Sequence, residues 1–234
     1  MELITIAFIC NVFILYNIIL LFFTNPLILI EKKPSNVKES SAIFWENKNL
    51  YVLGDSGQLL ISDNKTSSYF ALDFEDSEGI YVNDEHIFVI EERSRKVVIL
   101  KKETLKKIAE KHIPFSGRLN RGFEGITYNT NSKEFLVITE ENPCQIIRLD
   151  KDFNVIAYHD LQISEASDLA FFKNDIWVIS DVNATIYKLD SNNFNVKESW
   201  AINVLNPEGI TFSENQMIVV SDNLEKIYYY EIPQ

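Results

Sequence analysis

The sequence predicts an all-β fold, a β-propeller of five four-stranded blades (six is the alternative), preceded by an N-terminal transmembrane helix. Three observations support this. A short motif recurs five times at a spacing of about 40 residues, a typical length for one propeller blade. Each copy is followed by apolar runs of strand length that are rich in β-branched and aromatic residues. The first 30 residues contain a long stretch without charge. We therefore expect a membrane anchor at residues 1–30, a linker or closing strand at residues 31–38 and the propeller at residues 39–234.

The N-terminal stretch favours a retained anchor. Residues 4–23 contain no charged side chain, and about 20 apolar residues suffice for a helix to cross a bilayer. A cleaved signal peptide is the alternative, but it needs a basic start and a small-residue cleavage site, and this chain begins Met1-Glu2. Lys32 and Lys33 follow the stretch, and the positive-inside rule would place them in the cytoplasm. Two lysines are a small bias, so orientation and cleavage stay open.

The repeats predict the strands of each blade. The inner run of each copy begins with the recurring motif, at residues 39–45, 76–82, 122–128, 166–172 and 206–212. A second run, almost wholly apolar and ending in an acid, occupies residues 50–55, 87–92, 135–140, 176–181 and 217–222. A third run occupies residues 59–61, 97–100, 146–149, 186–189 and 227–230, and a looser fourth run occupies residues 68–72, 155–158 and 196–200. Four short strands per repeat are typical of a propeller blade.

Two places depart from this pattern. Residues 102–111 read as a short helical or loop insertion in the second repeat. The last repeat stops after its third run, so its outer strand must come from elsewhere. We expect residues 27–31, or residues 33–38 if the anchor consumes the former, to close the ring, because an open edge would leave backbone groups unpaired.

Composition limits the function classes. The formal net charge of -12 repels a phosphate backbone, so we expect no nucleic-acid partner. The two cysteines, Cys10 and Cys144, lie too far apart in the predicted organisation to form a disulfide framework. We expect a monomer, with a small ligand or a protein as its partner.

Four phrases carry a family resemblance. Residues 122–128 (GFEGITY), 167–170 (SDLA), 177–181 (WVISD) and 207–212 (PEGITF) occur in this order and resemble the SdiA-regulated (YjiK-like) family of bacterial propellers. The resemblance covers the chain from about residue 40 to its end. It implies a membrane-anchored or exported propeller on the extracytoplasmic side of the cell membrane, and it implies no defined activity. Similar motifs begin the blades of lactonase-like and phytase-like propellers.

The recurring motif also predicts a candidate metal site. Glu78, Glu124, Asp168 and Glu208 occupy one repeat position, which Ser41 fills in the first copy. The innermost strands of a propeller line its central channel, so these acids would form a ring. Carboxylate oxygens in a ring suit Ca²⁺ or Mg²⁺. Alternatively, each acid accepts backbone N–H groups of its own turn or the next blade and is structural.

A second set of acidic residues stands at the end of the second apolar run of each repeat. It comprises Asp55, Glu92, Glu141 or Glu140, Asp181 and Asp222, and we expect it on one face of the disc as a ligand-binding face. Capping of turns by these residues is the alternative. Arg121 precedes Glu124 and is expected either to pair with the acids or to bind an anionic group.

Two function classes remain open. The first is a non-catalytic envelope scaffold with an acidic, Ca²⁺-binding face. The second is a Ca²⁺-dependent hydrolase of the lactonase, phosphoesterase or phytase-like kind, in which bound metal activates water and Asn183 and Asn223 add ligands. Nucleophilic catalysis has little support, because the sequence has no Gly-x-Ser-x-Gly motif and its histidines, His86, His112 and His159, fall outside the inner repeat positions.

Overall fold

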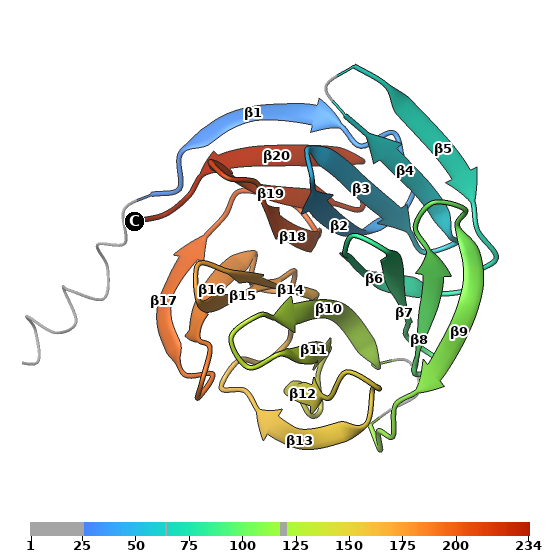
Figure 1. The fold of residues 1–234 in the computed structure, drawn as a ribbon. Coiled ribbons are helices and arrows are strands. Elements are labelled where there is room, and N and C mark those ends of the chain that lie inside the picture. Colours follow the sequence, from blue (N-terminus) through green and yellow to red (C-terminus); the bar gives the residue numbers. More distant parts are fainter. Residues whose placement is uncertain (1–25, 64, 118–120) are drawn as a thin grey trace, which may run out of the picture.

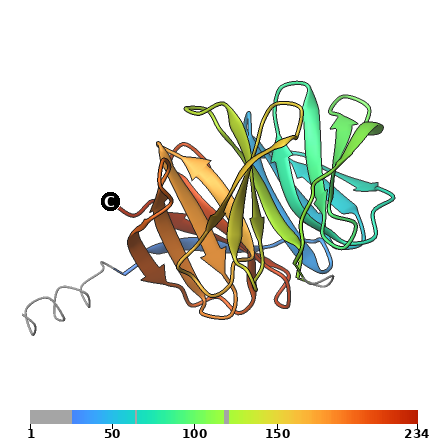
Figure 2. The ribbon, with the colours of Figure 1, turned by 90° about the horizontal axis from the view of Figure 1, so that it is seen from below.

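Five four-stranded antiparallel sheets surround a central channel in the computed structural model, which describes residues 26–63, 65–117 and 121–234 (Figure 1). The sheets are the blades of a five-bladed β-propeller, as the five repeats predict. Figure 2 shows the blades edge-on, with their strands running between the two faces of the disc.

Each blade is ordered from the channel outward. Blade 1 contains β2 (Ser40–Glu46), β3 (Asn49–Gly54), β4 (Gln58–Ser62) and β5 (Ser67–Ala71). Blade 2 contains β6 (Ser77–Val82), β7 (His86–Glu91), β8 (Lys96–Lys101) and β9 (Lys106–His112). Blade 3 contains β10 (Phe123–Asn129), β11 (Glu134–Thr139), β12 (Gln145–Leu149) and β13 (Val155–Asp160). Blade 4 contains β14 (Asp168–Phe172), β15 (Asp175–Ser180), β16 (Thr185–Asp190) and β17 (Val196–Ala201).

Blade 5 is closed by the N-terminal side of the chain. It contains β18 (Pro207–Phe212), β19 (Gln216–Ser221) and β20 (Lys226–Glu231), and its outer strand is β1 (Leu29–Pro34). Figure 1 shows β1 lying along β20, and the register runs from Leu29 opposite Tyr230 to Pro34 opposite Lys226. The N-terminal side of the chain therefore closes the ring, as expected, with a strand that overlaps both expected ranges, residues 27–31 and 33–38. Residues 29 and 30, expected within the anchor, belong to this strand.

Of the other residues expected in the anchor, 1–25 lie outside the described residues, and 26–28 lead into β1 without regular secondary structure. No helix in the described part of the chain is long and apolar enough to cross a membrane.

The prediction of a helical or loop insertion at residues 102–111 is wrong. After a turn at residues 102–105, β9 is the ordinary outer strand of blade 2 and pairs with β8. All but one of its residues are exposed, because an outer strand has no neighbouring blade on either side. It therefore lacks the apolar alternation that identifies a half-buried strand in a sequence.

The hydrophobic core lies between the blades. Five clusters each join neighbouring sheets, and the middle strands β7, β11 and β15 are buried along almost their whole length. Trp177 shows the packing between blades 4 and 5, where its ring stacks on Trp200 at 5.5 Å and meets Phe212 at 5.0 Å. Burial of the second strand on both faces explains its unbroken apolar run.

The strand directions define two faces of the disc. The inner strands begin, and the second strands end, on one face, which we call the cavity face. The other is the opposite face. β20 runs from the cavity face to the opposite face and β1 runs back, because the two pair antiparallel. Residues 26–28 therefore enter the propeller at the opposite face.

Candidate functional site: an acidic central cavity

In four of the five blades a β-bulge turns one side chain of the inner strand toward the channel. The pairing between first and second strands skips one residue at Ser41, Glu78, Glu124 and Glu208. Bulges re-aim side chains in this way. All four side chains line one central cavity on the cavity face. The sequence motif thus identifies this position correctly in four blades.

In blade 4 the structure corrects the predicted position by one residue. Asp168 pairs with Ile179, just as Gly125 pairs with Ile138, so Asp168 is the counterpart of the glycine and not of Glu124. Ser167 holds the inward position and lines the cavity. Alignment of the repeats by their acids pairs Asp168 with Glu124 and is off by one residue. Alignment by the apolar positions pairs Leu169 with Ile126 and gives the observed register.

Asp168 therefore has a structural role. Its Oδ1 accepts a 2.7 Å hydrogen bond from the Leu169 N–H, and its Oδ2 accepts one of 2.9 Å from the Ile210 N–H of blade 5. Burial raises the pKa of Asp168 well above its usual range, although both N–H groups oppose the shift. Of the four predicted ring acids, this one alone behaves as a backbone cap.

Glycine follows the inward residue because neighbouring inner strands nearly touch there. A Cβ atom on Gly125 would collide with Asp168 Oδ1 and lie 2.9 Å from the Leu169 nitrogen. A Cβ atom on Gly79 would lie 2.9 Å from the Gly125 Cα. The glycines thus permit the close approach that packs the carboxylates around a narrow channel.

The second acidic set follows the ends of the second strands, on the cavity face. In four blades the acid of this set donates its backbone N–H to a carbonyl of the same blade. The acceptor lies two positions before the inward residue. These acids are Asp55, Glu92, Glu140 and Asp222. Asp181 donates its N–H to Ser167 Oγ at 3.2 Å instead. These five side chains line the cavity.

Glu140, and not Glu141, is the member of this set in blade 3. Glu141 instead forms an ion pair with Arg121, whose Nη1 lies 3.8 Å from Glu140 Oε1. Arg121 therefore pairs with the acids, as one of its two predicted roles requires.

Glu165 is a cavity residue that the repeat motif does not predict. Its carboxylate lines the cavity and accepts hydrogen bonds from Ser180 Oγ, from Ser167 Oγ at 3.2 Å and from the Val182 N–H at 3.3 Å. It stands two residues before Ser167, where the other repeats have Glu39, Asp76, Gly122 and Asn206. The polar character of this column is the signal that could have identified it.

The result is one cavity of about 250 Å³ lined by acids. Nine carboxylates and two serine hydroxyls surround it: Asp55, Glu78, Glu92, Glu124, Glu140, Glu165, Asp181, Glu208 and Asp222, with Ser41 and Ser167. No lysine, arginine or histidine is among the described residues of this lining.

The glutamates at the inward positions of blades 2, 3 and 5 lack a partner within the described part of the chain. Among the described residues, no hydrogen bond or ion pair reaches the side chains of Glu78, Glu124 or Glu208. This distinguishes them from Asp168 and from Glu92, which accepts the Gly122 N–H at 2.8 Å. The alternative structural role, capping of backbone groups, therefore does not account for these three.

Burial and mutual repulsion make the charged forms costly. Burial first, and the nearby acids second, raise the pKa of Glu78 to about 9 and that of Glu208 to about 8. Burial likewise raises the pKa of Glu92 and of Glu165 to about 7, against the hydrogen bonds that they accept. Without a cation the cavity therefore holds protons near neutral pH.

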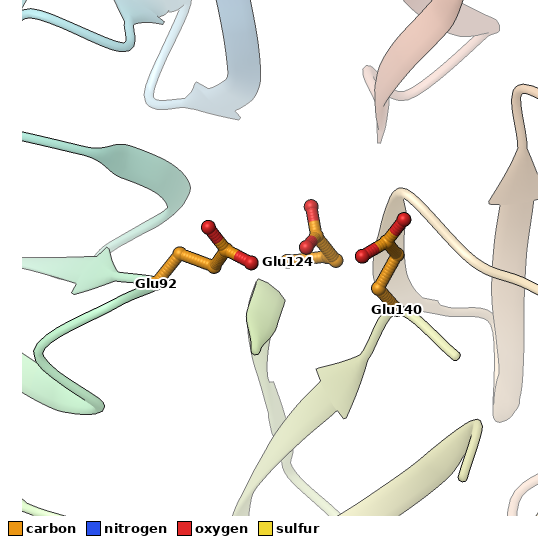
Figure 3. A group of neighbouring side chains, drawn as sticks. All are labelled: Glu92, Glu124 and Glu140. Atoms are coloured by element: carbon orange, nitrogen blue, oxygen red, sulfur yellow. The ribbon is translucent and has the colours of Figure 1, made fainter. Parts of the chain in front are cut away.

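Glu92, Glu124 and Glu140 form a candidate metal centre within the cavity. Each can place a ligand oxygen within 4.8 Å of the others, and Figure 3 shows the three carboxylates facing a common space. Ca²⁺ binds oxygen at about 2.3–2.6 Å, so two of its ligands are at most about 5 Å apart. The three side chains therefore fit one coordination shell.

Fold and site together define a five-bladed β-propeller with an acidic central cavity. A family model described as SdiA-regulated matches residues 35–199. The chain therefore belongs to the SdiA-regulated family, in agreement with the resemblance of its repeat motifs. No curated protein is significantly similar to it in sequence.

Solved structures share the fold at low identity. The glutaminyl cyclase of Myxococcus xanthus superimposes with a TM-score of 0.71 at 10% identity, covering 88% of this chain and 98% of that one. The virginiamycin B lyase of Staphylococcus aureus superimposes with a TM-score of 0.52 at 14% identity, covering 87% and 74%. At such identities the likeness concerns the fold alone.

Proposed function

We propose that this protein is a membrane-anchored envelope propeller, a binding scaffold that holds a divalent cation, Ca²⁺ by preference, in its central cavity. One observation carries the proposal: nine carboxylates from five blades converge on one cavity whose described lining contains no cationic side chain.

The ligand chemistry favours Ca²⁺. Glu92, Glu124 and Glu140 would supply its first carboxylate ligands, and the cavity holds further acids for a shell of 6 to 8 oxygens. Mg²⁺ requires a near-ideal octahedron and retains its waters, which a cluster of unequal aspartate and glutamate side chains matches less well. A cation would also offset the mutual repulsion that a closed ring of acids creates.

The anchor is residues 4–23, whose uncharged sequence is long enough to span a bilayer. The propeller would then stand on the extracytoplasmic side, as the resemblance implies. A scaffold in this place would present its cation-loaded cavity to a small ligand or a protein partner.

A metal-dependent hydrolase is the second candidate. In its favour, Glu78 and Glu208 keep protons near neutral pH beside the metal centre, as a general acid must. Against it, the described residues of the lining offer only carboxylates and serines. Asn183, a predicted additional ligand, is exposed and donates to Ser164 Oγ at 3.4 Å. We therefore favour the scaffold.

Calorimetric titration of the EDTA-treated full chain in detergent with Ca²⁺ tests the proposal. We expect saturable binding that Glu124→Gln abolishes. Glu214→Gln, which removes one exposed carboxylate from the opposite face, is the matched control and should bind as the unchanged protein does. Absence of heat at millimolar Ca²⁺ would refute the cation site. Turnover of phosphoesters or lactones by the loaded protein would decide for the hydrolase.

A further inference from the structure

The start of the propeller exposes an unusual apolar surface. Ile28, Leu29 and Ile30 are 55%, 41% and 48% exposed and follow one another at the beginning of β1. The Glu231 N–H donates a 2.9 Å hydrogen bond to the Ile28 carbonyl, which fixes this end of β1 at the opposite face, beside the end of β20.

Basic residues follow along the same strand. Lys32 and Lys33 lie further along β1 toward the cavity face, where they line a groove of about 370 Å³ with Pro34, Leu224, Glu225 and Lys226. Lys32 lies over the Tyr228 ring at 5.8 Å, and Lys33 pairs with Glu31 at 2.8 Å. The groove thus contains three lysines and one acid, Glu225.

The sequence preceding β1 indicates what covers this surface. The long apolar run ends at Phe23, the chain stays uncharged up to Ile30, and only residues 24–27 separate the apolar run from Ile28. Five residue steps span at most about 17 Å. The polar interfacial layer of a bilayer is roughly 5–8 Å deep on each side. If the run spans a bilayer, Ile28 to Ile30 lie within reach of its interface.

We propose that Ile28, Leu29 and Ile30 insert into the interfacial layer of a bilayer while Lys32 and Lys33 contact anionic lipid headgroups, so that the acidic cavity faces away from the membrane. This inference rests on the proposed anchor. Apolar side chains enter the boundary between headgroups and acyl chains, and nearby lysines add attraction to anionic lipid. The cavity mouth, at the other end of the strands, remains open to water-soluble ligands.

Site-directed spin labelling tests this geometry. The full chain with Cys10→Ser would carry a label at Ile30→Cys, or at Val182→Cys on the cavity face, where the side chain is 71% exposed. Cys144 is buried, and burial raises the pKa of its thiol to about 12, so it should stay unlabelled. The protein would be reconstituted into vesicles of phosphatidylcholine with phosphatidylglycerol.

We expect the Ile30 label to collide with dissolved oxygen more than with a water-soluble nickel chelate, and the Val182 label to show the reverse. Failure of the chain to float with the vesicles would refute both the anchor and the contact surface. Flotation with both labels fully accessible to the chelate would leave the anchor standing and overturn the contact surface. So would shielding of the Val182 label, as docking of the cavity face would produce.

A comparison of vesicles with and without anionic lipid completes the test. In vesicles of phosphatidylcholine alone, the Ile30 label should become more accessible to the chelate than in the mixed vesicles. Lys32→Gln with Lys33→Gln should remove this difference between lipids. Lys38→Gln changes an exposed lysine near the cavity face and should preserve it. Identical accessibility in both lipids for the unchanged chain would overturn the role of the lysines.

Discussion

Asp168 Oδ2 accepts a 2.9 Å hydrogen bond from the backbone N–H of Ile210, and this bond links the inner strands of blades 4 and 5. Three other blades have glycine at the position of Asp168. An acid that the repeat motif groups with the cavity acids is thus a structural link between blades. The distinction leads to opposite expectations for variants of Asp168 and of Glu124.

Asp168→Ala should destabilise the propeller without affecting the cation. The substitution leaves the buried Ile210 N–H without an acceptor, which costs about 1–3 kcal/mol. Urea unfolding with and without Ca²⁺ measures both effects. The free energy of unfolding should fall by a similar amount in each condition. Loss of the Ca²⁺ response in this variant would show that Asp168 contributes to the site.

Gly125→Ala should be more damaging than its size implies. The added methyl group would collide with Asp168 Oδ1 and crowd the Leu169 nitrogen, so two inner strands would have to separate. Overpacking of this kind costs about 1–3 kcal/mol or more. Thermal unfolding should show a clear fall in Tm. A Tm equal to that of the unchanged protein would contradict the close approach.

The blade pattern could be predicted from the sequence because buried middle strands leave unbroken apolar runs, such as residues 135–138. The closing strand could be predicted because the last repeat lacks one. β9 could not, because an exposed outer strand has no periodic apolar signal. Within the site, the inward position is readable wherever Glu-Gly occurs. The motif misplaces the inward position in blade 4, because the acid Asp168 stands where the Glu-Gly motifs have glycine. Only the strand register places Ser167 at the inward position.

Stability should depend on pH in an unusual direction when no divalent cation is present. The folded-state pKa values of Glu78 and Glu208 are raised to about 9 and about 8, so the folded protein binds more protons than the unfolded chain above pH 4.5. Stability is therefore full below about pH 4.5 and is lost as pH rises toward about 9. Thermal unfolding in EDTA should show Tm falling from pH 5 to pH 9. A Tm that rises over this range would contradict the raised pKa values.

Arg121 should weaken cation binding. Its guanidinium lies near Glu140 and Glu141, at the edge of the cavity, and opposes a metal by repulsion. Arg121→Gln should tighten Ca²⁺ binding by roughly 2- to 5-fold, the range expected for one partly exposed charge. Titration calorimetry measures the change. Weaker binding in the variant would mean that Arg121 holds the acids in place.

The most direct test of the proposed cation site is thermal unfolding of the full chain and of Glu124→Gln, in EDTA and then in Ca²⁺, at pH 8. Ca²⁺ at about 100 times its Kd should raise the Tm of the unchanged protein by roughly 5–10 °C, because the ion binds only the folded state. Glu124→Gln should unfold in EDTA at the same temperature or higher and show no rise with Ca²⁺. Equal shifts in both proteins, or a shift in neither, would contradict a cation held by the inward acids.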